Sequence, residues 1–174
     1  MYYRGDAVWK DDTKTSGTFS WERTKNGYRL PTECEWEFAA GGGNVETHDQ
    51  YVYSGSNIAE EVAWEYSNSG KEAHPVGTKK VNTLGIYDMS GNVAEWCYDY
   101  YADFGTGELT NPLHESGGYR CIRGCDCIRI YCNSVSISER YKAYAEEKDQ
   151  YYTGNSTNTV YKSILGIRIA RNAE

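Results

Sequence analysis

LGIYDMSGNVAEW, the run of residues 84–96, specifies more about the architecture of this chain than any other segment. It opens with a glycine-rich turn, and from Val93 to Tyr98 its side chains alternate with a period of two. A tight turn followed by such alternation predicts a β-strand. Asp88 and Glu95 place two carboxylates in the same segment, so it also contains oxygen ligands of the kind that a hard cation needs.

Composition limits the classes of function that are open to the chain. Its 174 residues predict a single domain, 1–174, with 18 Lys and Arg against 25 Asp and Glu and a net charge of −7. No basic run stands out, so nucleic-acid binding is not expected, and no apolar stretch is long enough to span a membrane. Tyrosine and tryptophan are abundant, at 17 and 5 residues against 3 Phe. Because such side chains serve both binding surfaces and loop-rich cores, the composition leaves both roles open.

One helix is strongly encoded. The run PTECEWEFAAGGG at residues 31–43 places Thr32 three positions before Glu35, which is the spacing of a capping box. Three glycines then end the helix, because glycine accepts the positive φ of a C-terminal cap. A second run at 138–147 is compatible with a helix, with Ser138 as its cap.

Short strands and long loops make up the rest of the chain. Alternation predicts strands at 119–123, 128–132 and 164–171. Residues 44–82 contain Gly, Ser and Asn throughout and predict an irregular segment. We expect its apolar and aromatic side chains to fasten it to the core: Tyr51, Tyr53, Ile58, Val62, Trp64 and Val76. Few helices, short strands and much loop indicate an α+β domain.

The chain has six cysteines, an even number. Four of them are close in sequence, Cys121, Cys125, Cys127 and Cys132, and the other two are Cys34 and Cys97. Their spacing fits no common zinc pattern, so we do not expect zinc. Disulfides would be stable outside the cytoplasm and free thiols inside it, and the sequence leaves both states open.

Several blocks of sequence are similar to those of one known family. They are GYRLPTECEWE at 27–37, HPVG at 74–77 with NTLG at 82–85, the block at 85–98, and RCIRG at 120–124 with LGIRIAR at 165–171. Taken together, these blocks resemble the formylglycine-generating-enzyme (sulfatase-modifying factor) family. The resemblance implies a loop-rich C-type lectin fold of that type. The helix that precedes the first block in the family is not found, so we expect a truncated N-terminus.

The resemblance also implies a calcium ion in the segment quoted first. The matching positions are Asp88, Gly91, Val93 and Glu95, with carboxylates from the two acidic residues and backbone carbonyls from the other two. An alternative needs no ion: Asp88 would cap the turn, and Glu95 would pair with an arginine of the core. The sequence leaves this choice open.

Catalytic members of the family carry two cysteines separated by four residues, and Cys127 and Cys132 reproduce that spacing. Two such thiolates could bind Cu(I), which is a soft ion. The surroundings differ, because the family's RGGS is replaced by RGCD at 123–126. The alternative for this pair of cysteines is a disulfide or two unrelated thiols.

Departures from the enzymes' pattern gather between Arg123 and Leu165, whereas the flanking blocks match it. This distribution resembles the variable target proteins of diversity-generating retroelements, in which a C-terminal segment is diversified on a scaffold of the same type. The resemblance implies a variable ligand-binding region at 119–171. The side chains assigned to ligand binding are Asp126, Ile128, Arg129, Tyr131, Arg140, Tyr141, Tyr144, Tyr151, Tyr152, Asn155 and Tyr161. Tyrosine suits such a surface because it combines area, a hydroxyl and low conformational entropy, although Tyr141 and Tyr144 could instead pack in the core.

From these features we expect a ligand-binding variable protein without catalysis, monomeric, and displayed at the cell surface or outside the cell. Its ligand would be a protein or another macromolecule. The alternative is a formylglycine-generating oxidase that acts on sulfatase cysteines through Cys127 and Cys132. The sugar-binding triplets of calcium-dependent lectins do not occur in the chain, so the fold does not imply carbohydrate binding.

Overall fold

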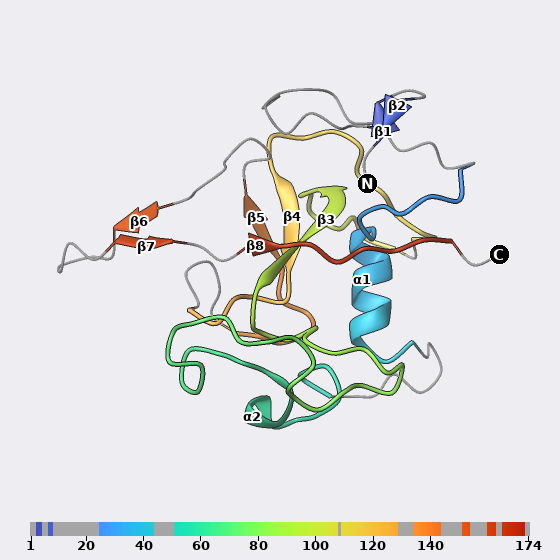
Figure 1. Ribbon diagram of the computed structural model, residues 1–174. Coiled ribbons are helices and arrows are strands. Elements are labelled where there is room, and N and C mark those ends of the chain that lie inside the picture. The colour runs from blue at the N-terminus through green and yellow to red at the C-terminus, as the bar shows by residue number, and fades with distance from the viewer. Residues whose placement is uncertain are drawn as a thin grey trace.

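A four-stranded sheet and one helix form the centre of the molecule (Figure 1). The computed structural model describes residues 25–43, 51–107, 109–128, 134–143 and 165–172, together with the backbone of short strands at 3–4, 7–8, 151–153 and 160–162. The helices are α1 (Glu33–Ala40) and α2 (Ala59–Val62). The strands are β1 (Tyr3–Arg4), β2 (Ala7–Val8), β3 (Ala94–Tyr100), β4 (Arg120–Arg123), β5 (Tyr141–Ala143), β6 (Tyr151–Thr153), β7 (Val160–Lys162) and β8 (Leu165–Gly166).

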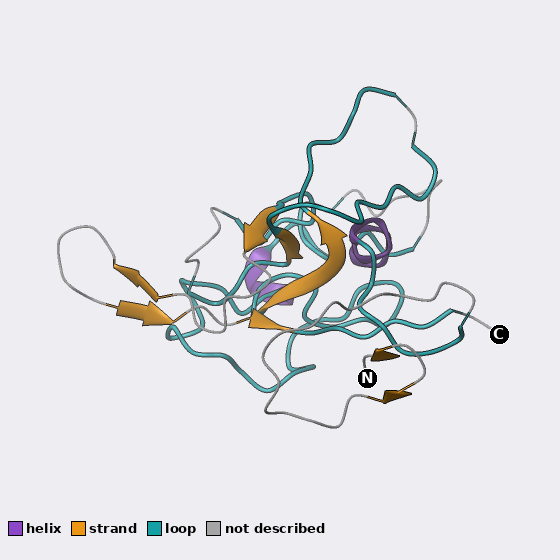
Figure 2. Cartoon of the chain, turned by 90° about the horizontal axis from the view of Figure 1, so that it is seen from above, coloured by secondary structure: helices purple, strands orange, loops and turns teal. Residues whose placement is uncertain are grey.

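The sheet has the strand order β5-β4-β3-β8. Strand β4 pairs antiparallel with both β3 and β5, whereas β8 pairs parallel with β3. Figure 2 shows that the strands are strongly curved, and α1 lies beside them. The pair formed by β6 and β7 lies to one side of this sheet in both views (Figures 1 and 2). Short strands, two helices in the described part and much loop confirm the prediction of an α+β domain.

Strand β3 has the alternation that its sequence predicts. The side chains of Glu95, Cys97 and Asp99 are buried, whereas the three that alternate with them are partly exposed. The buried side chains face α1: Trp36 donates its Nε1–H to Glu95 Oε2 over 2.7 Å, and Cys97 packs in the same core cluster as Trp36. The period of two therefore places two carboxylates inside the molecule, against the helix.

The capping box of α1 is confirmed. Thr32 Oγ1 accepts a hydrogen bond from the backbone N–H of Glu35, and Glu35 Oε2 accepts one from the backbone N–H of Thr32 at 2.8 Å. A third acceptor comes from the sheet, because Asp99 Oδ2 accepts from the backbone N–H of Glu33 at 2.7 Å. The first turn of the helix is thus satisfied both locally and by β3.

Arg123 joins the sheet to the helix through buried ion pairs. Its guanidinium, 0% exposed, donates to Glu33 Oε1 at 2.7 Å, to Glu37 Oε2 at 2.6 Å and to the carbonyl of Ile137 at 2.6 Å. The cation also lies 5.0 Å from the ring centroid of Trp36. A buried charge is tolerated because carboxylates and a carbonyl surround it.

Buried amides hold the long irregular segment before β3. Asn82 is 4% exposed and uses its whole side chain. Its Nδ2 donates to the carbonyl of Ala39 at 2.8 Å and to Ser54 Oγ at 3.0 Å. Its Oδ1 accepts from the backbone N–H groups of Leu84 and Ile86, each at 3.0 Å. One side chain therefore ties the end of α1 to two separate parts of the loop.

The apolar fastening expected for this segment is only partly present. Val62 is 2% exposed and packs with Tyr53 in a core cluster, as predicted. Tyr51, Ile58 and Val76 are 41%, 52% and 81% exposed, so the prediction is wrong for these three. Hydrogen bonds from asparagine and serine side chains supply much of the attachment that apolar contacts were expected to give.

The helix predicted at 138–147 is not formed where the structure describes this run. Residues 141–143 are strand β5, in which Tyr141 pairs with Ile122 of β4. Pairing with an existing strand outweighs a weak local helix preference, and tyrosine favours strands. The strand predicted at 119–123 is confirmed as β4, whereas the one predicted at 164–171 is regular only over Leu165–Gly166. Of the run 128–132, only Ile128 lies within the described residues, and it is in a turn.

Gly91→Ala tests the close approach of the turn before β3 to the loop. Gly91 has φ 75°, and a Cβ there would lie 2.3 Å from the carbonyl oxygen of Trp64. Gly85 has φ 76° with open space around it and is the matched control. We expect Gly85→Ala to lower the free energy of unfolding by about 1 kcal/mol, from the left-handed backbone alone. Gly91→Ala should cost about 3 kcal/mol or more, because backbone must also move. Equal losses in urea denaturation would contradict this packing.

Candidate functional site

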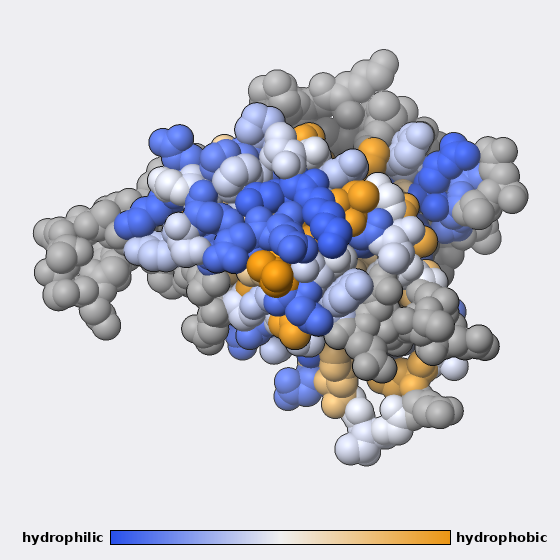
Figure 3. Space-filling view, turned by 90° about the horizontal axis from the view of Figure 1, so that it is seen from below, coloured by the Kyte–Doolittle hydropathy of each residue, from blue (hydrophilic) through white to orange (hydrophobic). Residues whose placement is uncertain are grey.

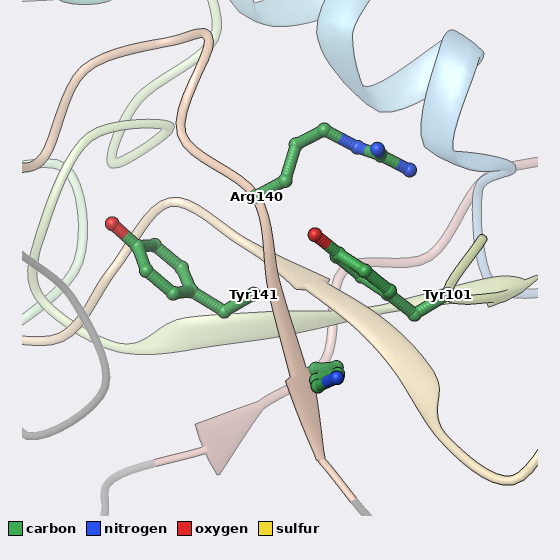
Figure 4. Close-up of a pocket in the computed structure, with 4 residues that line it drawn as sticks. Tyr101, Arg140 and Tyr141 are labelled. Atoms are coloured by element: carbon green, nitrogen blue, oxygen red, sulfur yellow. The ribbon is translucent and has the colours of Figure 1, made fainter. Parts of the chain in front are cut away.

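A pocket of about 230 Å³ lies beside β5 and is lined by Tyr101, Arg140, Tyr141 and Lys142 (Figure 4). We call it the β5 pocket. Tyr101 stands directly after β3, and its backbone N–H donates to the carbonyl of Tyr119 at 2.8 Å, which keeps it next to the sheet. In Figure 4 the rings of Tyr101 and Tyr141 lie on opposite sides of the β5 backbone.

Arg140 is fixed in position by Glu33. Its Nε and Nη2 donate to the two carboxylate oxygens of Glu33 over 2.5 and 2.7 Å, and Nη2 also donates to the carbonyl of Ala102 at 3.0 Å. A bidentate pair of this kind fixes both orientation and distance. The hydrogen bonds that Arg140 donates to Glu33 raise the pKa of Arg140, so the guanidinium is charged at every physiological pH.

Aromatic rings surround the cations of the pocket. The guanidinium carbon of Arg140 lies 3.7 Å from the ring centroid of Phe104 and 4.9 Å from that of Tyr101. Lys142 Nζ lies 4.9 Å from the centroid of Tyr119 and 5.4 Å from that of Tyr101. Cation–π contacts therefore hold both charges against a wall of rings.

Two polar groups of the pocket are free to receive a ligand. Lys142 is exposed and forms no ion pair with any residue that the structure describes. The hydroxyl of Tyr101 likewise makes no hydrogen bond within the described ranges. Tyr141 differs, because its hydroxyl donates to Glu139 Oε2 at 2.5 Å. The open side of the pocket is thus its Tyr101 side.

The structure brings two of the predicted ligand-binding residues, Arg140 and Tyr141, to the β5 pocket. Asp126 differs from the expectation: it is 1% exposed, and its Oδ1 accepts from the backbone N–H of Ile128 at 3.1 Å, so it supports the turn from inside. Tyr151, Tyr152 and Tyr161 stand on β6 and β7, of which only the backbone is described, and Arg129, Tyr131, Tyr144 and Asn155 lie outside the described residues.

Tyr101 and Lys142 complete the pocket but were not among the residues expected to bind a ligand. The sequence offered a signal for Lys142, which follows Tyr141 inside the region expected to vary. Tyr101 lies before that region, at the far end of β3. Tyr101 comes to lie beside β5 because β4 pairs with both β3 and β5. The local sequence around Tyr101 does not indicate this pairing.

The residues expected to bind calcium do not present an open set of ligands. Both oxygens of Glu95 are occupied: Arg168 donates to Oε1 and Oε2, each at 2.8 Å, and Trp36 donates to Oε2. Asp88 Oδ2 accepts from the backbone N–H of Gly77 at 2.7 Å, and only its Oδ1 has no partner in the described part of the chain. Glu95 thus has the arginine partner of the alternative without an ion, and the buried Asp88 Oδ1 is the carboxylate oxygen of the two residues that a cation could still use.

The cysteine proposed for copper chemistry is inside the molecule. Cys127 is 0% exposed, and burial, together with the charge of Asp126, raises the pKa of its thiol to about 11. A protonated thiol is a poor nucleophile and a poor metal ligand. Cys125 is disulfide-bonded, and Cys132 lies outside the described residues. Among the residues described, no group of three or more His, Cys, Asp or Glu side chains could hold a metal ion.

Known sequences identify the domain type. The family model described as "Sulfatase-modifying factor enzyme 1-like domain" matches residues 7–173. Chaperone protein LppX of Paenibacillus barcinonensis is 43% identical over 111 residues, which cover 54% of this chain and 39% of that protein. The formylglycine-generating enzyme of Streptomyces coelicolor is 32% identical over 134 residues, which cover 66% of this chain and 41% of the enzyme. The chain therefore spans less than half the length of either relative.

Among solved structures, Treponema denticola variable protein 1 is similar to this chain with a TM-score of 0.71 and 34% sequence identity. The match covers 90% of this chain and 54% of that one. The predicted resemblance to the formylglycine-generating-enzyme type of fold, and to a variable protein that uses it, is confirmed by these similarities.

Two buried carboxylates should respond to acid with opposite signs. Burial alone would raise the pKa of Glu33, but hydrogen bonds from Arg140 and Cys121 and the charge of Arg123 bring it below its ordinary value. Burial raises the pKa of Asp99. Glu33 therefore adds stability above its unfolded pKa and loses it as the pH falls, whereas Asp99 binds a proton more readily when folded.

We expect Glu33→Gln to flatten the loss of unfolding free energy between pH 7 and about pH 4, and Asp99→Asn to steepen it. Urea denaturation of each variant at both pH values gives the change in unfolding free energy between them. A loss of stability that is the same at both pH values cancels in this difference. Slopes that change in the same direction would contradict the assignment.

Calcium binding is tested by thermal unfolding. Because Arg168 occupies Glu95, we expect millimolar calcium or a chelator to leave the melting temperature unchanged within about 1 °C. Arg168→Gln, which leaves Glu95 without its cation, serves as the comparison and should melt at a lower temperature in either condition. A rise of the wild-type melting temperature with calcium would show that the folded protein binds the ion and would contradict this expectation.

Proposed function

Because the chain belongs to the family of sulfatase-modifying factor enzyme 1-like domains, we propose that it is a ligand-binding variable protein, in which this fold displays a diversified C-terminal surface. The observation that carries the proposal is the composition of the β5 pocket. Three of its four lining residues, Arg140, Tyr141 and Lys142, come from β5 and its approach, between Arg123 and Leu165, where the sequence departs from the enzymes' pattern.

A variable surface needs a support that does not depend on the variable residues. Here the support is the contact of the buried Arg123 with the buried Glu33 and the partly exposed Glu37, which joins β4 to α1. Lys142 stands on β5, the edge strand of the sheet, and is exposed, so an exchange there disturbs little of the core. Binding residues on a rigid scaffold can change at small cost to stability.

The composition of the pocket is that of a protein-binding surface. Tyrosines and an arginine are the residue types enriched at recognition surfaces, because they bury large areas and also form directed polar contacts. Figure 3 shows the face seen from below, where hydrophilic side chains predominate among the described residues and apolar ones form small groups. We infer a protein or another macromolecule as the ligand, and display outside the cytoplasm, where the disulfide at Cys125 would be stable.

No helix of the described residues is long and apolar enough to cross a bilayer. Attachment to a cell surface, a monomeric state and the whole protein's partners are parts of the proposal. The similarity to Treponema denticola variable protein 1 supports the variable-protein part of the proposal, because that match covers 90% of this chain.

A formylglycine-generating oxidase is the second candidate, and the 32% identity to the Streptomyces coelicolor enzyme favours it. The chemistry would require Cys127 as a thiolate that reaches a peptide substrate. Its burial and its raised pKa of about 11 oppose both requirements. The variable binding protein therefore accounts better for the described residues.

Sequencing the locus in several isolates tests the proposal. We expect a neighbouring reverse-transcriptase gene and an imperfect repeat of the segment that encodes residues 120–171. Substitutions between isolates should fall on positions such as Tyr141 and Lys142 and spare Arg123 and Glu33, which the scaffold needs. A locus without such a repeat, or substitutions spread evenly over the chain, would refute the proposed function.

A further inference from the structure

We propose that the β5 pocket binds a carboxylate side chain of a protein partner, with Lys142 and the hydroxyl of Tyr101 as its direct contacts. The inference rests on the proposed function and adds the chemical class of the ligand. It follows from the size of the pocket, from which of its charges is uncompensated, and from the placement of the free polar groups.

The pocket has the size of an anchor site for one side chain. Its volume is about 230 Å³. Sites for small organic ligands and cofactors usually enclose about 300–1,000 Å³. Protein interfaces, in contrast, often depend on one or two side chains that enter small pockets near the centre of the contact. The volume therefore favours a protruding side chain of a larger partner.

Charge selects the sign of that side chain. Arg140 is neutralised by its bidentate pair with Glu33, which is 2% exposed and faces away from solvent. Lys142 is exposed and has no carboxylate partner among the described residues. The carboxylate of Glu139 is bound by the Tyr141 hydroxyl, on the far side of β5 from Tyr101. The Tyr101 side of the pocket thus carries a positive charge that a partner can compensate.

Geometry favours a carboxylate over a larger anion. Lys142 Nζ lies 5.4 Å from the ring centroid of Tyr101, so the cation and this tyrosine line the same part of the pocket. A carboxylate has two oxygens and can accept from both donors at once. Phosphate and sulfate groups are usually bound by several cations or by clusters of backbone N–H groups, and here a single lysine is free. The rings of Tyr101 and Tyr119 lie beside Lys142 Nζ and give a partner side chain an aromatic surface next to the cation.

The experiment uses immobilised poly-L-glutamate as the probe, because many weak sites on one polymer raise the measured affinity. Binding of the full chain is measured at low and at physiological salt. Heparin and poly-L-lysine are compared under the same conditions, so that carboxylate recognition is separated from a general affinity for polyanions. The melting temperature of each variant shows that it is folded.

We expect wild-type protein to bind poly-L-glutamate, Lys142→Gln to weaken binding about tenfold, and Tyr101→Phe to weaken it by about threefold to tenfold. The matched control is Lys80→Gln, which removes the same charge from a distant lysine that already pairs with Glu61, and it should bind as the wild type does. The proposal is overturned if poly-L-glutamate does not bind, if Lys142→Gln and Lys80→Gln behave alike, or if heparin binds more tightly through the same residues. These binding results do not depend on the gene organisation at the locus. The proposed function and the proposed ligand class can therefore be refuted independently.

Discussion

The carboxylate of Glu33 is the group on which the other elements of this structure depend. It is 2% exposed and accepts hydrogen bonds from two guanidiniums, those of Arg123 and Arg140. Through these contacts α1, β4 and the approach to β5 meet at one point. An unpaired charge at that depth would cost several kcal/mol, so the three elements stabilise one another only when all the partners are in place.

This arrangement separates the part of the molecule that fixes the fold from the part that can meet a ligand. Arg123 is fully buried and pairs with carboxylates of α1. Arg140 pairs with one of these carboxylates, that of Glu33, and directly precedes the edge strand β5. The residue after Tyr141, Lys142, is exposed and contributes no ion pair to the described scaffold. A change at that position removes a surface charge, whereas a change at Glu33 removes the bidentate partner of Arg140 and one of the two carboxylates that pair with the buried Arg123. The positions that the fold requires, Arg123 and Glu33, are thus connected through Arg140 to the exposed position Lys142, which can change without loss of the core.

Features that depend on neighbours in sequence were predictable. The capping box of Thr32 and Glu35 joins residues three apart, and the alternation along β3 is a property of consecutive side chains. Features that depend on distant partners were not. The run at 138–147 has a weak local preference for helix, and only its pairing with β4 makes it a strand. Asp126 looked like a variable surface residue by its type, but its carboxylate is buried and accepts from the backbone of the turn that follows it.

The same reasoning explains why family resemblance carries the fold further than the chemistry. The motif that contains Asp88 and Glu95 requires a cation beside its buried carboxylate, and the sequence of the motif does not state which one. In this structure the cation is Arg168, 73 residues beyond Glu95, which holds both of its oxygens. A guanidinium supplied by the chain satisfies the electrostatic requirement as an ion would, and it also ties the segment after β8 to the centre of the sheet. The buried carboxylate of Glu95 therefore has its positive charge from the chain itself, so likeness of the motif identifies the fold without identifying the chemistry.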